Sequence, residues 1–180
     1  MKKFLAAICA IILLLTGCGV LSEPVLNLGM TFEQFKAEYN ATIAENFSET
    51  GWDISAATLK TGEDKDFFSY RFSDNVSLMG AADKDSGIMK ELVVMLIPQA
   101  QNETEKALLA YITLMLMLNP ELTVEQRGEL IKELKLTGED VTDLLNQNDG
   151  MAVRGKVKYR TTFVKDMGVL QFIASAKDLE

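Results

Sequence analysis

Four basic residues at alternate positions are the clearest chemical pattern in the C-terminal part of this chain. They are Arg154, Lys156, Lys158 and Arg160, and the residues between them are apolar or small. Alternate side chains of a β-strand point to the same face, so the pattern predicts one strand over 151–164 with a basic row on one side. Such a row could contact an acidic protein, an anionic glycan or anionic lipid headgroups. A solvated face balanced by neighbouring acidic residues is the simpler interpretation.

Residue types that serve catalysis are scarce. The 180 residues include no His, which is the usual acid–base residue near neutral pH and the commonest metal ligand. Residues 83–87 begin like a calcium-binding loop, but its twelfth position, which should be Glu, is Val94. A carboxylate pair could serve a glycosidase, yet none stands out among the 26 acidic residues. We therefore expect no catalytic residue, no metal site and no cofactor.

The N-terminal residues have the organisation of an export signal. Lys2 and Lys3 precede an apolar run over 4–15, which is too short to span a bilayer. The run ends in Leu15-Thr16-Gly17-Cys18, which resembles the lipobox of bacterial lipoproteins. The resemblance implies that 1–17 is a cleaved signal peptide and that the thiol of Cys18 carries diacylglycerol. An ordinary signal peptide with a chance cysteine is the alternative.

The same resemblance predicts the location of the protein and its association with a membrane. The lipid on Cys18 would hold the chain at a membrane, and Gly19 lacks the acidic character that often marks inner-membrane retention. In a two-membrane bacterium this points to the outer membrane, facing the periplasm; otherwise it points to the outer face of the cell membrane. Cleavage would also move the net charge from −8 to about −10, which disfavours nucleic acid as a partner.

Residues 18–28 are expected to form the anchor and a short tether, and 29–180 a single domain. Thr31 and Gln34 have the spacing of a capping box, which predicts a helix that begins at residue 32. Gly29-Met30-Thr31, together with Gln34-Phe35, is similar to the opening of the small lipoprotein of the β-barrel assembly machinery. It is also similar to the repeat start of β-lactamase-inhibitor-like domains.

Periodicity predicts an α+β fold in the order α-ββββ-ααα-ββ. We expect an antiparallel sheet of five to six strands with the helices packed on one face. Helix 107–118 is apolar all round except at Thr113, which indicates either a core helix or the surface of a homodimer or another complex. The expected strands are 52–60, 67–72, 76–82, 88–97, 151–164 and 169–176, and the later helices begin at 103, at 124 and near 139.

These observations favour a lipid-anchored cell-envelope protein that acts as a non-enzymatic binding or scaffolding module. Its partners would be the membrane, through the lipid, and an envelope protein or an anionic glycan or lipid. Two alternatives remain open. A small-ligand carrier would need a pocket between the sheet and the apolar helix, and a carboxylate-dependent envelope enzyme would need paired buried carboxylates in a cleft.

Overall fold

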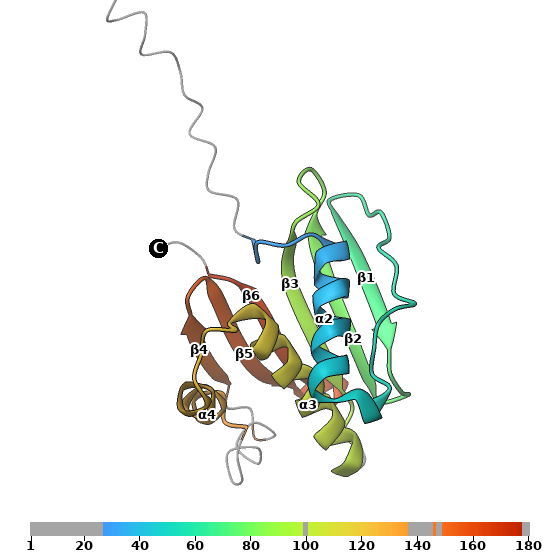
Figure 1. Ribbon diagram of the computed structural model, residues 1–180. Coiled ribbons are helices and arrows are strands. Elements are labelled where there is room, and N and C mark those ends of the chain that lie inside the picture. Colours follow the sequence, from blue (N-terminus) through green and yellow to red (C-terminus); the bar gives the residue numbers. More distant parts are fainter. Residues whose placement is uncertain (1–26, 99–100, 137–145, 147–148, 178–180) are drawn as a thin grey trace, which may run out of the picture.

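The computed structural model describes residues 27–98, 101–136, 146 and 149–177 (Figure 1). The signal peptide, Cys18, most of the tether and most of the helix expected near 139–146 lie outside the described residues. The helices are α2 (Phe32–Asn46), α3 (Gln101–Leu118) and α4 (Val124–Glu133), with short 3-10 turns η1 (Ser48–Thr50) and η2 (Lys165–Met167). The strands are β1 (Lys65–Arg71), β2 (Val76–Asp83), β3 (Met89–Leu96), β4 (Gly150–Arg154), β5 (Val157–Val164) and β6 (Val169–Ala176).

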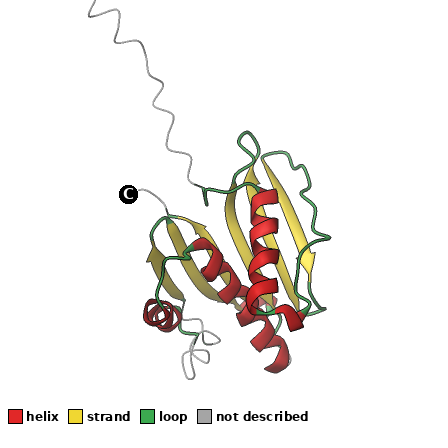
Figure 2. Ribbon diagram, in the orientation of Figure 1, coloured by secondary structure: helices red, strands yellow, loops and turns green. Residues whose placement is uncertain are grey.

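The strands form one antiparallel sheet in the order β1-β2-β3-β6-β5-β4, and the described helices cover one face of it (Figures 1 and 2). The predicted fold class is confirmed. After β3 the chain passes through α3 and α4 to the far edge, where β4 begins a second meander. That meander returns towards the middle of the sheet, so β6 pairs with β3 and Ile173 lies opposite Val93.

Helix α2 forms as its sequence predicts. The Thr31 side chain accepts from the Gln34 N–H, and the Gln34 side chain accepts from the Thr31 N–H at 2.8 Å, which completes the capping box. The apolar stripe of α2 is buried, and its first two rings lie against Phe68 of β1, with centroids 5.0 and 5.5 Å away. The buried stripe consists of Phe32, Phe35, Tyr39 and Ile43.

The prediction of a strand over 52–60 is wrong. This segment has only an isolated bridge, between Lys60 and Phe67, so three strands rather than four precede α3. Trp52, Ile54 and Ala57 of this segment are nevertheless buried, and the Trp52 ring stacks on Phe72 with centroids 4.5 Å apart. The Ile54 N–H donates to the Asn40 side chain of α2 at 2.7 Å rather than to a neighbouring strand. Apolar residues at alternate positions in a coil that packs on a helix therefore gave the same sequence pattern as a strand.

The single strand expected over 151–164 is also wrong, because the chain reverses at Gly155. Arg154 of β4 pairs with Val157 of β5, which leaves a loop of two residues, Gly155 and Lys156. Gly155 has φ of +55°, the sign that a type II′ hairpin turn requires at its first position. The expected pair of C-terminal strands thus becomes three, and the last of them matches the expected range of 169–176.

Helix α3 belongs to the core. Its inner side is fully buried, and the Tyr111 hydroxyl donates to the Ile173 carbonyl of β6 at 3.2 Å. The interface between α3 and the sheet is filled by side chains, among them Leu92, Leu114 and Phe172, and the Tyr111 ring lies 5.1 Å from that of Phe172. Within the described part of the chain, no helix combines the length and apolar character that crossing a membrane requires.

Candidate functional site: the open face of the sheet

The face of the sheet that points away from the helices has an apolar centre. In β3, Leu92, Val94 and Leu96 are buried under the helices, so Val93 and Met95 point the other way. The strand register places Val93 beside Met79 of β2 and Ile173 of β6. We call this surface the open face and define its apolar strip by residues that share this orientation: Phe67, Met79, Ala81, Val93, Met95, Ile97, Ile173, Met151 and Val153.

Large apolar side chains are strongly exposed on the open face. Phe67 is 42% exposed and Met151 is 58% exposed, and Ile97 and Val153 are each 38% exposed. A shallow hollow of about 330 Å³ lies over β1, β2 and β3, lined by apolar side chains and edged by Lys65, Glu91 and Gln171. Single exposed apolar residues are normal on a protein surface, but a contiguous patch on one face marks an interaction site.

The structure separates the four basic residues of the predicted row. Across a two-residue turn the paired positions 154 and 157, and then 153 and 158, share a face. Lys158 and Arg160 therefore lie on the open face with Val153, whereas Arg154 lies on the helix face. The single row predicted from the sequence does not form, because the turn reverses which positions, even or odd, face the helices.

Arg154 and Lys156 have roles away from the open face. The Arg154 guanidinium binds both carboxylate oxygens of Glu133 on α4, at 2.7 and 3.1 Å, and this contact holds the pKa of Glu133 below its ordinary value. Lys156 occupies the turn, and its carbonyl accepts from the Lys177 N–H. The contact surface predicted from four residues is thus reduced to Lys158 and Arg160.

Sequence reasoning missed two further basic residues of the open face, Lys65 and Arg71 at the opposite flank. They lie on β1, with side chains on the same side as Phe67. Arg71 forms an exposed ion pair with Asp74 at 3.8 Å, and Arg160 pairs with Asp149. Burial alone would raise the pKa of Asp149, but the hydrogen bonds from Thr162 and Arg160 hold it below its ordinary value.

The two layers of the molecule carry opposite charge. The six strands hold six basic and three acidic residues, whereas the three described helices hold eight acidic and four basic residues. The strand layer is therefore positive although the whole chain has a formal charge of −8. A negatively charged partner is favoured at the strand layer and disfavoured at the helices.

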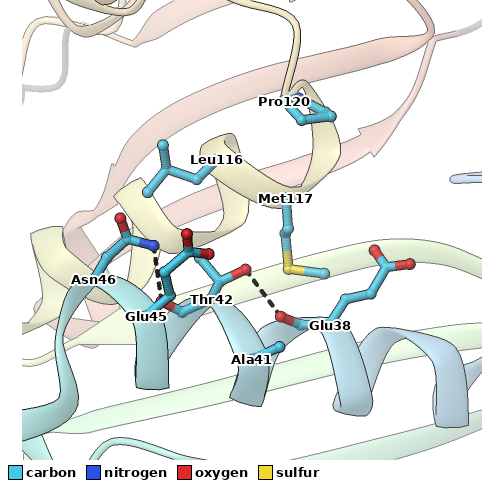
Figure 3. A pocket seen from close by; sticks show the side chains of 8 residues that line it. All are labelled: Glu38, Ala41, Thr42, Glu45, Asn46, Leu116, Met117 and Pro120. Atoms are coloured by element: carbon cyan, nitrogen blue, oxygen red, sulfur yellow. Dashed lines mark hydrogen bonds between the residues drawn. The ribbon is translucent and has the colours of Figure 1, made fainter.

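A second hollow, of about 320 Å³, lies between α2 and the end of α3 (Figure 3). The Met117 side chain points across it towards α2, and Glu38 and Glu45 stand at its sides. The Thr42 hydroxyl donates to the Glu38 carbonyl and the Asn46 amide donates to the Thr42 carbonyl, so the helix itself uses these donors. This hollow lies between two helices, whereas the expected carrier pocket would lie between the sheet and α3.

The described residues contain no cluster of three or more His, Cys, Asp or Glu side chains that could hold a metal ion. No family model, curated protein or solved structure was found that matches this chain. The open face of the sheet, apolar at its centre and basic at its two flanks, is therefore the candidate site on structural grounds alone.

Proposed function

We propose that this chain is a lipid-anchored cell-envelope protein and a non-enzymatic binding module that contacts its partner through the open face. The observation that carries the proposal is the uncovered apolar strip. The solvated face of an antiparallel sheet normally alternates towards polar residues, yet the outward positions of β3 include Val93 and Met95, followed by Ile97. A partner that covered this strip would bury apolar surface that is otherwise in contact with water.

The proposed anchor is compatible with the way the chain enters the domain. The Leu28 N–H donates to the Met89 carbonyl at 2.7 Å, and the Met89 N–H donates to the Met30 carbonyl, at the end of β3 where the β2–β3 turn lies. Ten residues separate Cys18 from Leu28 in the sequence, and a chain of that length reaches at most about 35 Å even if it is fully extended. Lipid on Cys18 would therefore hold the open face within tens of ångströms of the membrane.

The anchor is tested with the two cysteines of the chain. In cells fed an alkyne-tagged fatty acid, Cys18→Ser should lose the label and accumulate as the unprocessed form. Cys9→Ser is the matched control, since Cys9 lies in the apolar run, and it should be labelled and processed like the wild type. Equal labelling of Cys18→Ser and the wild type would contradict lipid attachment at this residue.

The contact surface is tested with a photo-reactive phenylalanine analogue in the full-length protein in its membrane. Placed at Val93 or Ile173, the analogue should cross-link the protein to a partner of defined mass. Placed at Ala44, an exposed position on α2, it should not give that product. Absence of the cross-linked product at both open-face positions, or its equal formation from Ala44, would contradict the proposed role of the open face.

The two alternative functions have no specific observation in their favour. The carrier requires space between the sheet and α3, where Tyr111, Leu114 and Phe172 are fully buried and in close packing. The enzyme requires carboxylates held together in a cleft. Two of the acidic residues near the open face, Asp83 and Asp149, are each paired with a basic side chain, and Glu91 is the one carboxylate among the described residues that lines the hollow over β1, β2 and β3. Both remain outcomes that a ligand or activity screen of the purified protein would detect.

A further inference from the structure

Basic residues lie on both sides of the central part of the apolar strip, which is formed by β2, β3 and β6, whereas Met151 and Val153 of β4 lie beyond the second basic flank. Lys65 and Arg71 lie on β1, and Lys158 and Arg160 lie on β5, with β2, β3 and β6 between them. Four strand spacings separate β1 from β5, which is about 19 Å. Between the flanks the apolar side chains of the strip extend from the level of Ala81, which pairs with Glu91 on the same face, to Ile97, or about 20 Å along the strands.

These dimensions fit one α-helix that lies along the strip. A helix with its side chains is about 10–12 Å across, which leaves about 4 Å on each side between the helix and the basic flanks. The flexible stems of Lys and Arg can cover such a gap. A strip of about 20 Å corresponds to about 13 helical residues, or nearly four turns.

The basic flanks determine which charge the helix should carry beside its apolar stripe. Carboxylates along both borders of its apolar stripe would meet Lys65 and Arg71 on one side and Lys158 and Arg160 on the other. The present ion pairs of Arg71 with Asp74 and of Arg160 with Asp149 lie at the surface, where solvent screens such pairs and they contribute little to stability. Carboxylates of a partner can therefore replace them at low cost.

A second copy of this chain fits the open face poorly. If two open faces were stacked with their strips together, a basic flank of one copy would lie over a basic flank of the other, whether β1 met β1 or β5. Like charges placed together across an interface oppose association. The acidic helices of the chain do not lie on its own open face, because all of those described cover the opposite face of the sheet (Figure 1).

We propose that the occupant of the open face is an amphipathic α-helix of a partner protein, about four turns long, with Asp or Glu on both borders of its apolar stripe. The proposal rests on the binding function proposed above and specifies the partner of that same site. Association would add a helix layer to the uncovered side of the sheet and would weaken as salt screens the flanking charges.

The inference is tested with synthetic peptides and the full-length protein in discs of zwitterionic lipid. Three fluorescent 18-residue peptides share one set of Leu, Ala and linker residues: one has Glu borders, one has Lys borders, and the third is the first in scrambled order. The Glu-bordered helix should bind, should lose at least tenfold in affinity between low and high salt, and should bind at least tenfold more tightly than the other two.

Charge reversal gives the sharper comparison. The double variant Lys65→Glu, Lys158→Glu should lose at least tenfold in affinity for the Glu-bordered peptide and should gain binding of the Lys-bordered one. The matched control is Lys106→Glu, Lys132→Glu, which makes the same change in net charge at exposed positions on α3 and α4 and should bind like the wild type. The melting curve of each variant checks that the fold is retained, and Met79→Gln tests the apolar strip without a charge change.

Each other result overturns the inference in a defined way. If the Lys-bordered peptide binds as tightly as the Glu-bordered one, the flanking charges do not select the partner. If the scrambled peptide binds equally well, the partner is not recognised as an amphipathic helix. Self-association that Met79→Gln abolishes would make a second copy the occupant, and binding to anionic vesicles with no peptide binding would make it the membrane. If no peptide binds while Val93 still cross-links to a partner, the helix inference fails and the proposed function stands; if neither occurs, both fail.

Discussion

Two buried tyrosines of this chain differ in whether their hydroxyls have a hydrogen-bond partner. Tyr39 on α2 and Tyr159 on β5 are both fully buried, and burial raises the pKa of each. The Tyr159 hydroxyl donates to the Asn119 side chain at 2.7 Å, whereas the Tyr39 hydroxyl has no hydrogen-bond partner in the described part of the structure. A buried hydroxyl without a partner costs free energy that a phenylalanine would not incur.

We therefore expect opposite outcomes from the same substitution. Tyr159→Phe should lower the free energy of unfolding by about 1–3 kcal/mol, because it leaves the buried Asn119 oxygen without its donor. Tyr39→Phe should be neutral or slightly stabilising. Urea unfolding of both variants, followed by the fluorescence of Trp52, measures the difference, and an equal loss for the two would show that hydroxyl satisfaction does not decide it.

Asp83 gives a prediction for acid stability. The ammonium of Lys90 and the N–H and hydroxyl of Ser86 donate to its carboxylate, and these bonds hold the pKa of Asp83 well below its ordinary value. The resulting stabilisation is present above the unfolded pKa, about 3.9, and is lost as the pH falls through the folded pKa. Asp83→Asn should therefore be less stable than the wild type at neutral pH, and the gap should shrink from about pH 5 downwards.

The matched control for that experiment is Asp85→Asn, which makes the same charge change two residues along the turn. Unfolding is measured in urea at neutral pH and at several acidic pH values. If the gap between the wild type and Asp83→Asn widened on acidification, the sign of the linkage would be wrong. If Asp85→Asn gave the same pH profile, the effect would be one of net charge rather than of the Lys90 contact.

Among the helices and strands, the sequence predicted correctly those elements that depend on residues close together in the chain. The capping box at Thr31 and the stripe that follows it predict α2 because the residues that form the cap and the buried side are near neighbours. The prediction of a strand over 52–60 failed because the Ile54 N–H donates to the side chain of Asn40 and the Ala57 N–H donates to the Ile54 carbonyl, partners that no local pattern reveals. The glycine at position 155 was the available signal for the β4–β5 turn, since a glycine within an alternating run marks a break.

The contact between β4 and the chain that follows α4 gives an element-scale prediction. A Cβ at Gly150 would lie 2.4 Å from the Leu134 carbonyl oxygen, so Gly150→Ala should cost about 1–3 kcal/mol through forced movement of backbone. In α4, a Cβ at Gly128 meets nothing within 4 Å, so Gly128→Ala should stabilise by about 0.5–1 kcal/mol through helix propensity. Thermal melts of the two variants test both; a stabilising Gly150→Ala would contradict the close approach.

At the scale of the whole molecule, the candidate site was beyond the sequence because it depends on strand order. The β3–β6 pairing joins Val93 to Ile173, eighty residues later in the chain, and the two basic flanks become flanks only once β4 to β6 are placed beside β3. The sequence alone predicted only that Lys158 and Arg160 belong to a basic surface. The lipobox at Cys18 remains a prediction, because it lies outside the described residues.

The packing predicts that the domain folds without the anchor. The core contacts of the described chain begin with Leu28 and Met30 beside Phe32, and the sheet is complete from residues 65–176. A protein of residues 28–180 should melt in one cooperative transition, with the near-ultraviolet signal of the Trp52 and Phe72 stack lost at the same temperature as the far-ultraviolet signal. Loss of the near-ultraviolet signal well before the other would show that the anchor region or a partner completes the core.

The chain joins the domain at one end of the strands, beside Met89, rather than in the middle of either face. If the proposed anchor holds, a domain tethered there would pivot about its strand ends, and the open face would be directed along the membrane plane. Its encounters would then follow the surface density of partners in the same membrane, counted per unit area, and would depend little on molarity in the surrounding fluid. Crowding of the membrane, rather than dilution of the compartment, would set its occupancy.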